Sequence, residues 1–194
     1  MTLTGGASLS TSKYKYGTSS LYLSGSNQYL TSSSATISST YFTNGKGFSM
    51  GCWFYMISAT NYVPLLSLRF NTSVFWQINQ FGGNVDIQIS NGDYQRSIPY
   101  TLNTWTHIAW VAEQQIPGGT FSNTLYINNV AVDTFTAAAN RWFSGYTLNG
   151  NLDVGTDINY PSNGCFNGYI DNVFLYAYPL SSSNINDLYN GTIL

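Results

Sequence analysis

The sequence contains very little charge. Asp, Glu, Lys and Arg make up 7% of its 194 residues, and the formal net charge at pH 7 is −2. The six lysines and arginines are scattered singly, so they do not form the clustered positive surface that displaces counterions from nucleic-acid phosphates. No apolar run approaches the ~20 residues that span a bilayer. The sequence therefore argues against nucleic-acid partners and against a membrane span.

Cysteines and targeting signals are equally scarce. Cys52 and Cys165 are too few to define a disulfide framework, and they are either buried free thiols or one bridge between two strands. Residues 1–12 lack the charged-then-apolar order of a secretory signal. Either a signal was removed upstream, or the chain reaches its destination without one, as virion proteins do. We expect a virion surface or an extracellular location.

Aromatic and neutral polar residues dominate what is present. Aromatic residues make up 16% of the chain, and 16 of them are tyrosines. Residues 85–89 alternate apolar and polar side chains, which predicts a half-buried strand. Asn91-Gly92 and Asn128-Asn129 are typical of hairpin turns, because Gly and Asn tolerate positive φ. Residues 105–111 are almost wholly apolar and predict a central strand.

One segment near the C-terminus has helical spacing. Ser181 is a capping residue, Ile185, Leu188 and Tyr189 share one face, and Gly191 is a stop signal. The remaining pattern is a series of short strands separated by turns. It predicts an all-β fold, a two-sheet antiparallel jelly-roll sandwich with one short C-terminal helical turn. We divide the chain into an N-terminal arm, 1–14, and one domain, 15–194.

Four segments resemble the laminin-G-like branch of the concanavalin-A-like lectin/glucanase superfamily, which is related to the pentraxins. They read KYGTSSLYLSGSNQYL (15–30), FSMGCWFY (48–55), WTHIAWV followed by LYINNV (105–130), and FNGYIDNV with the helical segment (166–189). The resemblance implies two curved antiparallel sheets with the first and last strands paired. It does not by itself specify an activity, because this fold serves lectins, glycanases, adhesins and structural modules.

The chain departs from the family's motifs at four positions. Ser24 and Gln28 replace acidic residues of the opening motif, Gly51 replaces a glutamate, and Asn129 replaces the turn glycine. The loss of acidic residues is consistent with a neutral surface that holds little metal.

Catalytic residue types are almost missing. Glycoside hydrolysis needs two carboxylates that flank the scissile bond, yet Glu113 is the only glutamate, and Asp153 and Asp157 are the nearest carboxylate pair. His107 is the only histidine, and its apolar neighbours predict a structural residue that is hydrogen-bonded across the sheet. We therefore expect no enzymatic activity.

Calcium is the one cofactor that the sequence leaves open. Calcium prefers six to eight oxygen ligands, and the resemblance places candidate ligands at Asn71, Asp157 and Asn159, which would form a weak site at best. The alternative is that Asp157 and Asn159 only form a turn. Asp171 is expected to bind neighbouring backbone amides and not a metal.

Aromatic residues near loops are the candidates for glycan contact, because Tyr and Trp stack on sugar faces. Trp53, Trp105 and Trp110 lie in strongly predicted strands and are expected in the core. The candidate ligand-binding residues are Asn71, Trp76, Tyr94, Trp142, Tyr146 and Tyr160. For each aromatic residue the alternative is a partly buried packing role.

These observations favour a non-enzymatic surface module. We expect a virion decoration or attachment protein that binds a glycan or a cell-surface receptor. A purely structural subunit of a capsid or fibre is the alternative, with other virion proteins or further copies of the chain as partners. A glycan-active hydrolase or lyase is the least favoured interpretation.

Overall fold

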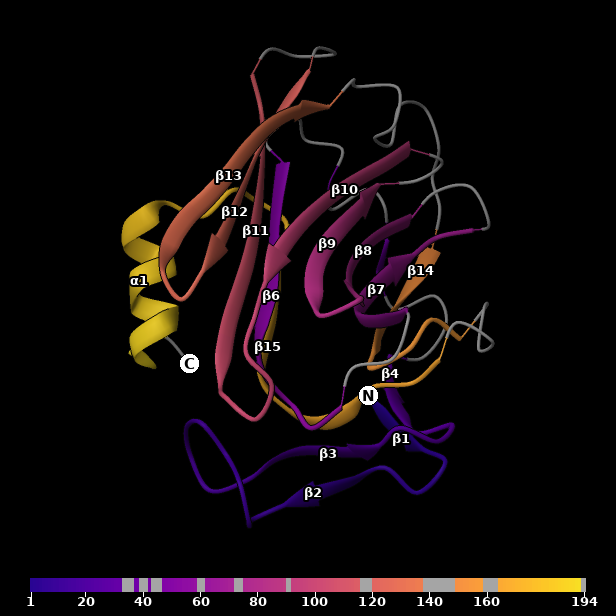
Figure 1. The fold of residues 1–194 in the computed structure, drawn as a ribbon. Helices are drawn as coiled ribbons and strands as arrows, with labels where there is room; N and C mark the ends of the chain where they lie inside the picture. The colour runs from indigo at the N-terminus through magenta and orange to yellow at the C-terminus, as the bar shows by residue number, and fades with distance from the viewer. Residues whose placement is uncertain are drawn as a thin grey trace.

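The computed structural model describes residues 1–32, 37–38, 42, 47–58, 62–71, 75–89, 92–115, 120–137, 149–158 and 164–192. Two antiparallel sheets pack face to face, and the helix lies beside β11, β12 and β13 on the outer side of one sheet (Figure 1). This arrangement confirms the predicted two-sheet sandwich. Among the described residues, no helix has the length and apolar character needed to cross a bilayer.

The first sheet has eight strands. Seven of them run in the order β1 (Thr2–Thr4), β4 (Tyr29–Thr31), β14 (Asn149–Val154), β7 (Val63–Arg69), β8 (Phe75–Phe81), β9 (Asn84–Ile89) and β10 (Gly92–Pro99). The short strand β5 (Ile37–Ser38) pairs with β14 off this path. The hairpin expected around Asn91-Gly92 is confirmed by the pairing of β9 with β10.

The second sheet has seven strands. Their order is β13 (Val130–Ala137), β12 (Phe121–Ile127), β11 (Thr106–Gln114), β6 (Gly47–Met56), β15 (Asn167–Tyr176), β3 (Ser20–Ser24) and β2 (Ser8–Ser10). The strand of the opening motif, β3, pairs with the last strand, β15, as the family resemblance implied. Residues 1–14, which we set apart as an arm, contribute an edge strand to each sheet.

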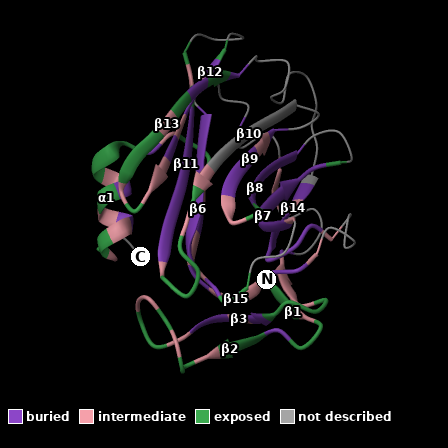
Figure 2. Cartoon of the chain, in the orientation of Figure 1, coloured by how far each residue is buried: buried purple, intermediate pink, exposed green. Residues whose placement is uncertain are grey.

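The hydrophobic core lies between the sheets and is rich in aromatic rings. Phe48 stacks on Trp76 with ring centroids 4.0 Å apart and meets Trp110 edge-on at 4.8 Å. The buried indole of Trp110 donates to the Asn123 side chain at 3.0 Å, so its polar atom is satisfied. Figure 2 shows the buried residues concentrated in β6, β11 and the middle strands of the first sheet.

The tryptophans correct two expectations. Trp76, expected near the surface, is only 1% exposed, because it shares its face of β8 with the core residue Ile78. Trp105, expected in the core, is half-buried, because it precedes β11 at the end of the sheet. Trp53 and Trp110 are buried as expected.

The helix α1 (Ser182–Asn190) ends where the sequence signals predicted. The Ser181 side chain caps it in a reciprocal capping box with Asn184, and Gly191 ends it with φ of 71°. Ile185 and Leu188 pack with Phe174 in a second, smaller hydrophobic cluster on the outer face of the seven-stranded sheet. The helix therefore covers part of that face.

The turn at Asn128-Asn129 is confirmed, with φ of 49° and 67°. Asn129 stands where the family has glycine, and its side-chain amide donates to Asn186 on α1 at 2.8 Å. The asparagine therefore ties the hairpin to the helix, which a glycine could not do.

Both cysteines are buried free thiols. The disulfide alternative for Cys52 and Cys165 is therefore wrong. The Sγ atom of Cys165 lies 3.8 Å from the Thr156 hydroxyl.

Candidate functional site

A row of polar side chains crosses the face of the eight-stranded sheet that points away from the core. Successive side chains of a strand alternate between the two faces of the sheet. Because Trp76 and Ile78 on β8 point into the core, Gln77 between them points to the other face. The strand register aligns one polar residue from each of five neighbouring strands: Thr31 on β4, Asp153 on β14, Ser67 on β7, Gln77 on β8 and Gln88 on β9. We call these five residues the polar row. Its three central members are buried, and Thr31 and Gln88 at its ends are half-buried.

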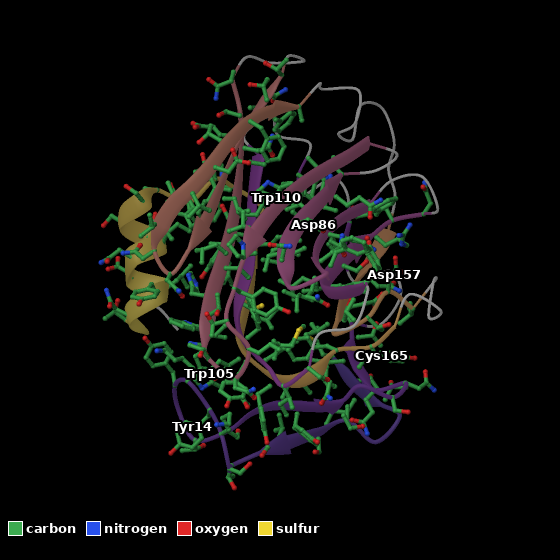
Figure 3. All side chains as sticks on the ribbon, in the orientation of Figure 1. Tyr14, Asp86, Trp105, Trp110, Asp157 and Cys165 are labelled. Carbon is green, nitrogen blue, oxygen red and sulfur yellow. The ribbon has the colours of Figure 1, made fainter. Side chains whose placement is uncertain are left out.

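A buried ion pair lies next to the polar row. The Arg69 Nε donates to both carboxylate oxygens of Asp157, at 3.1 and 2.9 Å, and its Nη2 lies 2.5 Å from Oδ2. The Gln77 amide donates to the same Oδ2 at 2.5 Å. The guanidinium also contacts the Phe75 ring face at 4.0 Å and donates to the Asn71 carbonyl at 3.2 Å. These contacts hold the segment after β14 against the sheet. Figure 3 labels Asp157 on the side of the molecule where the eight-stranded sheet lies.

Asp153 is a buried acid with a raised pKa. Burial raises the pKa of its carboxyl from 3.8 to about 6, and the neighbouring Asp157 carboxylate adds to that shift. The Thr31 hydroxyl donates to its Oδ1 at 2.6 Å and the Ile158 N–H to its Oδ2 at 3.3 Å, and both bonds oppose the rise. Asp153 therefore changes protonation at mildly acidic pH.

Gln88, at the β9 end of the row, is half-buried. Tyr62 is half-buried, and its hydroxyl lies 2.9 Å from Oε1 of Gln88 and 3.2 Å from Oε1 of Gln77. The half-buried phenol ring of Tyr62 and the half-buried amide of Gln88 therefore lie side by side at this end of the row. This combination offers one apolar face and several hydrogen-bonding atoms to a ligand.

Asn79 lies on the same face, two residues beyond Gln77 on β8. Its side chain is 1% exposed, and neither its amide oxygen nor its amide nitrogen has a hydrogen-bond partner in the part of the chain that the structure describes. A buried polar group without a partner costs free energy, about 1–3 kcal/mol. Asn79 thus carries unused hydrogen-bonding capacity beside the row.

The sequence candidates are distributed unevenly. Asn71 is exposed at the rim, beside Arg69. Trp76 faces the core, where its ring cannot reach a ligand in solvent. Tyr94 lies on β10, but its side chain is outside the described part. Four further candidates lie outside the described residues, and they are Trp142, Tyr146, Asn159 and Tyr160.

The groups around Asp157 do not form a calcium site. Both of its oxygens accept hydrogen bonds from the positively charged Arg69, and the Asn71 carbonyl accepts another. A cation at this point would face the guanidinium at close range, which is unfavourable. Within the described residues, no group of three or more His, Cys, Asp or Glu side chains gathers as a metal site.

The polar row itself was missed in the sequence. Its signal lies in the alternation of β8 and β9. On β8, Gln77 and Asn79 alternate with the buried Trp76, Ile78 and Gln80, and on β9, Asp86 and Gln88 alternate with buried Val and Ile. The alternation revealed the strands. It did not reveal that polar residues of five separate strands align.

His107 is buried, as predicted, on the outer face of the seven-stranded sheet. Its ring lies 5.2 Å from the Trp53 ring and 5.8 Å from the Tyr189 ring. Burial lowers the pKa of His107 to about 4, and Lys15 adds to the effect. Nδ1 has no hydrogen-bond partner among the described residues, so the predicted bond across the sheet is not made by that atom. The backbone N–H bonds Oδ1 of Asn128 at 2.9 Å.

Asp171 binds backbone amides, as expected. Its Oδ2 accepts from the N–H groups of Lys15 at 2.7 Å and Tyr16 at 3.2 Å, and its Oδ1 accepts from Asn172 at 2.9 Å. The carboxylate thereby fastens the loop between β2 and β3 to β15.

Comparison with known proteins agrees with this architecture. The family described as the concanavalin A-like lectin/glucanases superfamily, in its laminin-G-type branch, matches residues 10–186. Domain 4 of AbnA, an extracellular arabinanase from Geobacillus stearothermophilus solved with arabinotriose, is similar with a TM-score of 0.68 and 17% identity, over 95% of this chain and 82% of that one. No curated protein matches.

The binding domain of botulinum neurotoxin DC, solved in complex with SialylT, has a TM-score of 0.67 and 14% identity over 98% of this chain. A binding-domain structure of botulinum neurotoxin C/D mosaic serotype has a TM-score of 0.66 and 18% identity over the whole chain. The chain spans 46% of each of these two toxin chains. At these identities the likeness shows the fold.

The two-sheet sandwich with a polar outer face defines a lectin-type β-sandwich domain. The chain belongs to the concanavalin A-like lectin/glucanases superfamily.

Proposed function

We propose that the chain is a non-enzymatic carbohydrate-binding module, and that a sugar contacts the polar row at its accessible end, beside Tyr62 and Gln88. The main observation behind this proposal is that hydroxyl, carboxylate and amide side chains from five strands align on one face of the eight-stranded sheet. Sugar hydroxyls both donate and accept hydrogen bonds, so a rigid array of such groups suits them.

Two further features support a glycan ligand. The Tyr62 ring supplies an apolar face for stacking on a sugar ring. The similar arabinanase domain was solved with arabinotriose, and the similar neurotoxin domain with SialylT.

The carboxylates support binding without turnover. Asp157 is occupied by Arg69 and Gln77, so it is not available as a nucleophile or base. Asp153 is buried and bonded to Thr31, and Glu113 lies exposed on the other sheet. A glycosidase needs a free acid and a free base or nucleophile on the two sides of one bond, and these side chains do not supply that pair.

We place this module on a virion surface or in the extracellular space, as a decoration or attachment protein. Its low charge and its Ser-, Thr-, Asn- and Tyr-rich surface suit contact with glycans or receptors. Binding of the labelled domain to host cells, lost after glycosidase treatment of those cells, is the expected result. Binding that survives deglycosylation would point to a protein receptor instead.

A glycan array followed by calorimetry tests the proposal. Wild type is expected to bind at least one oligosaccharide, and Tyr62→Ala and Gln88→Ala should each weaken that binding about 3- to 10-fold, the effect of losing one ring contact or one neutral hydrogen bond. Thr136→Ala, at an exposed position of β13, is the matched control. A wild-type domain that binds no sugar on the array contradicts the proposal.

A second candidate function is self-assembly as a structural subunit. It is favoured by β13, an edge strand of the seven-stranded sheet, on which Val130 and Val132 are 61% and 43% exposed. Exposed apolar edge strands invite pairing with another chain. Light scattering should then show a fixed oligomer that Val132→Lys converts to a monomer, whereas a monomeric wild type would argue against it.

A further inference from the structure

Four aromatic side chains line up across the outer face of the seven-stranded sheet, far from the polar row. Tyr22 on β3 is in register with Tyr169 on β15, which is in register with Tyr55 on β6. Trp105, just before β11, continues the line. The ring centroids are 5.0, 6.0 and 5.7 Å apart in that order. We call these residues the aromatic row, and every member is half-buried.

The helix explains why this row is accessible. Two residues further along the same strands, Trp53 is buried, and its ring stacks on Tyr189 of α1 at 5.1 Å. The helix ends at Asn190, and the aromatic row lies on the next line of side chains along the sheet. Within the described part of the chain, the hydroxyls of Tyr22, Tyr55 and Tyr169 make no hydrogen bond. The row therefore presents ring surface and unused hydroxyls.

The loop between β2 and β3 places one cation over a ring of the aromatic row and a second over the neighbouring Trp53. Asp171 binds the backbone amides of Lys15 and Tyr16, and the Ser20 hydroxyl donates to the Lys13 carbonyl at 2.6 Å. As a result, the ammonium of Lys13 lies 4.1 Å over the Tyr55 ring, and that of Lys15 lies 4.0 Å over the Trp53 ring. Figure 3 shows Tyr14, in the middle of this loop, at the same end of the molecule as Trp105.

The charge of this region is unbalanced. The ion pair that the structure describes joins Arg69 to Asp157 on the other sheet, and neither lysine takes part in an ion pair within the described residues. The Asp171 carboxylate, the acid next to the loop, accepts three backbone N–H groups. Lys13 is therefore positioned to meet an anionic group from outside.

We propose that the aromatic row and Lys13 form a binding site for an acidic oligosaccharide, one that carries a carboxylate on a sugar ring. This inference rests on the proposed function, carbohydrate binding, and adds to it a second site, on the opposite sheet. The apolar faces of the sugars contact the rings of Tyr169 and Trp105. The tyrosine hydroxyls bond the sugar hydroxyls, and the Lys13 ammonium pairs with the carboxylate.

Packing alone does not explain the arrangement. Cross-strand aromatic pairs do stabilise sheets, by about 0.2–1 kcal/mol each, and the row has that role as well. A packing role needs neither unbonded hydroxyls nor a lysine that its own loop anchors over a ring. Those two features fit a ligand with both hydroxyl and carboxylate groups.

Calorimetry with matched sugars tests the site. The probes are 3′-sialyllactose and trigalacturonic acid as acidic sugars, and lactose as the neutral counterpart of the first. The variants are Lys13→Gln, which removes only the charge, and Trp105→Ala, whose folding is checked by thermal melting. Thr136→Ala, at an exposed position of β13, is the control, and Tyr62→Ala tests whether the polar row is the site instead.

Wild type is expected to bind an acidic probe, more weakly at 300 than at 50 mM salt because ion pairs are screened. Lys13→Gln should weaken that binding about tenfold, and Trp105→Ala by a similar factor. Thr136→Ala should leave it unchanged.

Two results would overturn the assignment. If acidic sugars bind wild type and Lys13→Gln equally, or if Tyr62→Ala alone abolishes binding, the aromatic row is not the site, while carbohydrate binding stands. If wild type binds neither these probes nor any sugar on the array, the site and the proposed function both fail.

Discussion

Removing the charge of Asp157 is expected to destabilise the domain strongly. The side chains of Arg69 and Asp157 are 4% and 0% exposed, so water cannot solvate either group once its partner is lost. The substitution Asp157→Asn keeps the shape of the side chain and removes its charge. It leaves the Arg69 guanidinium buried without a counterion.

The expected cost follows from that burial. Breaking a buried ion pair by removing one partner costs about 3–5 kcal/mol, because the remaining charge is uncompensated. For a domain of this size each kcal/mol lowers Tm by about 2–4 °C, which corresponds to a loss of roughly 6–20 °C. The hydrogen bond from Gln77 can persist to the amide oxygen, so most of the loss comes from the charge.

Urea unfolding of four proteins measures this energy: wild type, Asp157→Asn, Arg69→Met and the double variant. Because the two groups contact each other, the double variant should lose much less stability than the two single losses added together. Additive losses, or a cost below about 1 kcal/mol for Asp157→Asn, would refute the reasoning. Such values are typical of an ion pair that solvent screens.

Other predictions concern protonation, the thiols and the core. Because burial raises the pKa of Asp153 from 3.8 to about 6, its carboxyl contributes stability to the folded state. That contribution is present below pH 3.8 and is lost as pH rises through 6. Because burial lowers the pKa of His107 from 6.5 to about 4, its neutral ring contributes stability to the folded state. That contribution is present above pH 6.5 and is lost as pH falls through 4. Between pH 7 and 4 the two trends oppose each other. Lowering the pH should therefore destabilise Asp153→Asn more steeply than wild type, and it should destabilise His107→Phe less steeply. If urea titrations give the same pH dependence of unfolding free energy for all three proteins, this reasoning is wrong. Burial raises the pKa of the Cys52 thiol and Cys165 is buried, so a thiol reagent should modify neither in the native protein and both in urea; fast native labelling would be inconsistent with that burial. Phe48→Ala should cost about 3–5 kcal/mol of unfolding free energy by leaving a cavity against the aromatic core, and a loss under 1 kcal/mol in denaturant melts would show that the core collapses around it.

Features that depend on neighbouring residues were predicted correctly from the sequence. The alternation of residues 85–89, the positive-φ pair at Asn128-Asn129 and the helix cap at Ser181 all depend on a few neighbouring residues, and the structure confirms each of them. The shortage of acidic residues was readable in the same way, because composition does not depend on folding.

The candidate site was readable only in part. Asp157 was singled out as a calcium ligand, whereas its partners are Arg69, 88 residues away, and Gln77, 80 residues away. No spacing rule connects such positions. The free state of Cys52 and Cys165 was likewise left open, since it depends on where two distant strands lie.

By itself the sequence determined many of the strands, two hairpin turns, the helix and the family, because these follow from side-chain period and from backbone preferences within a few residues. It did not predict β1 and β2, which lie in residues 1–14. Only the tertiary structure decided which face of each strand is covered. For that reason Trp76, expected near the surface, is buried, and Trp105, expected in the core, is half-buried. Tyr22 and Tyr169 lie in register on neighbouring strands, although the chain between them passes through both sheets. Pairing of distant strands sets which side chains share a surface, and that surface is where a ligand would bind.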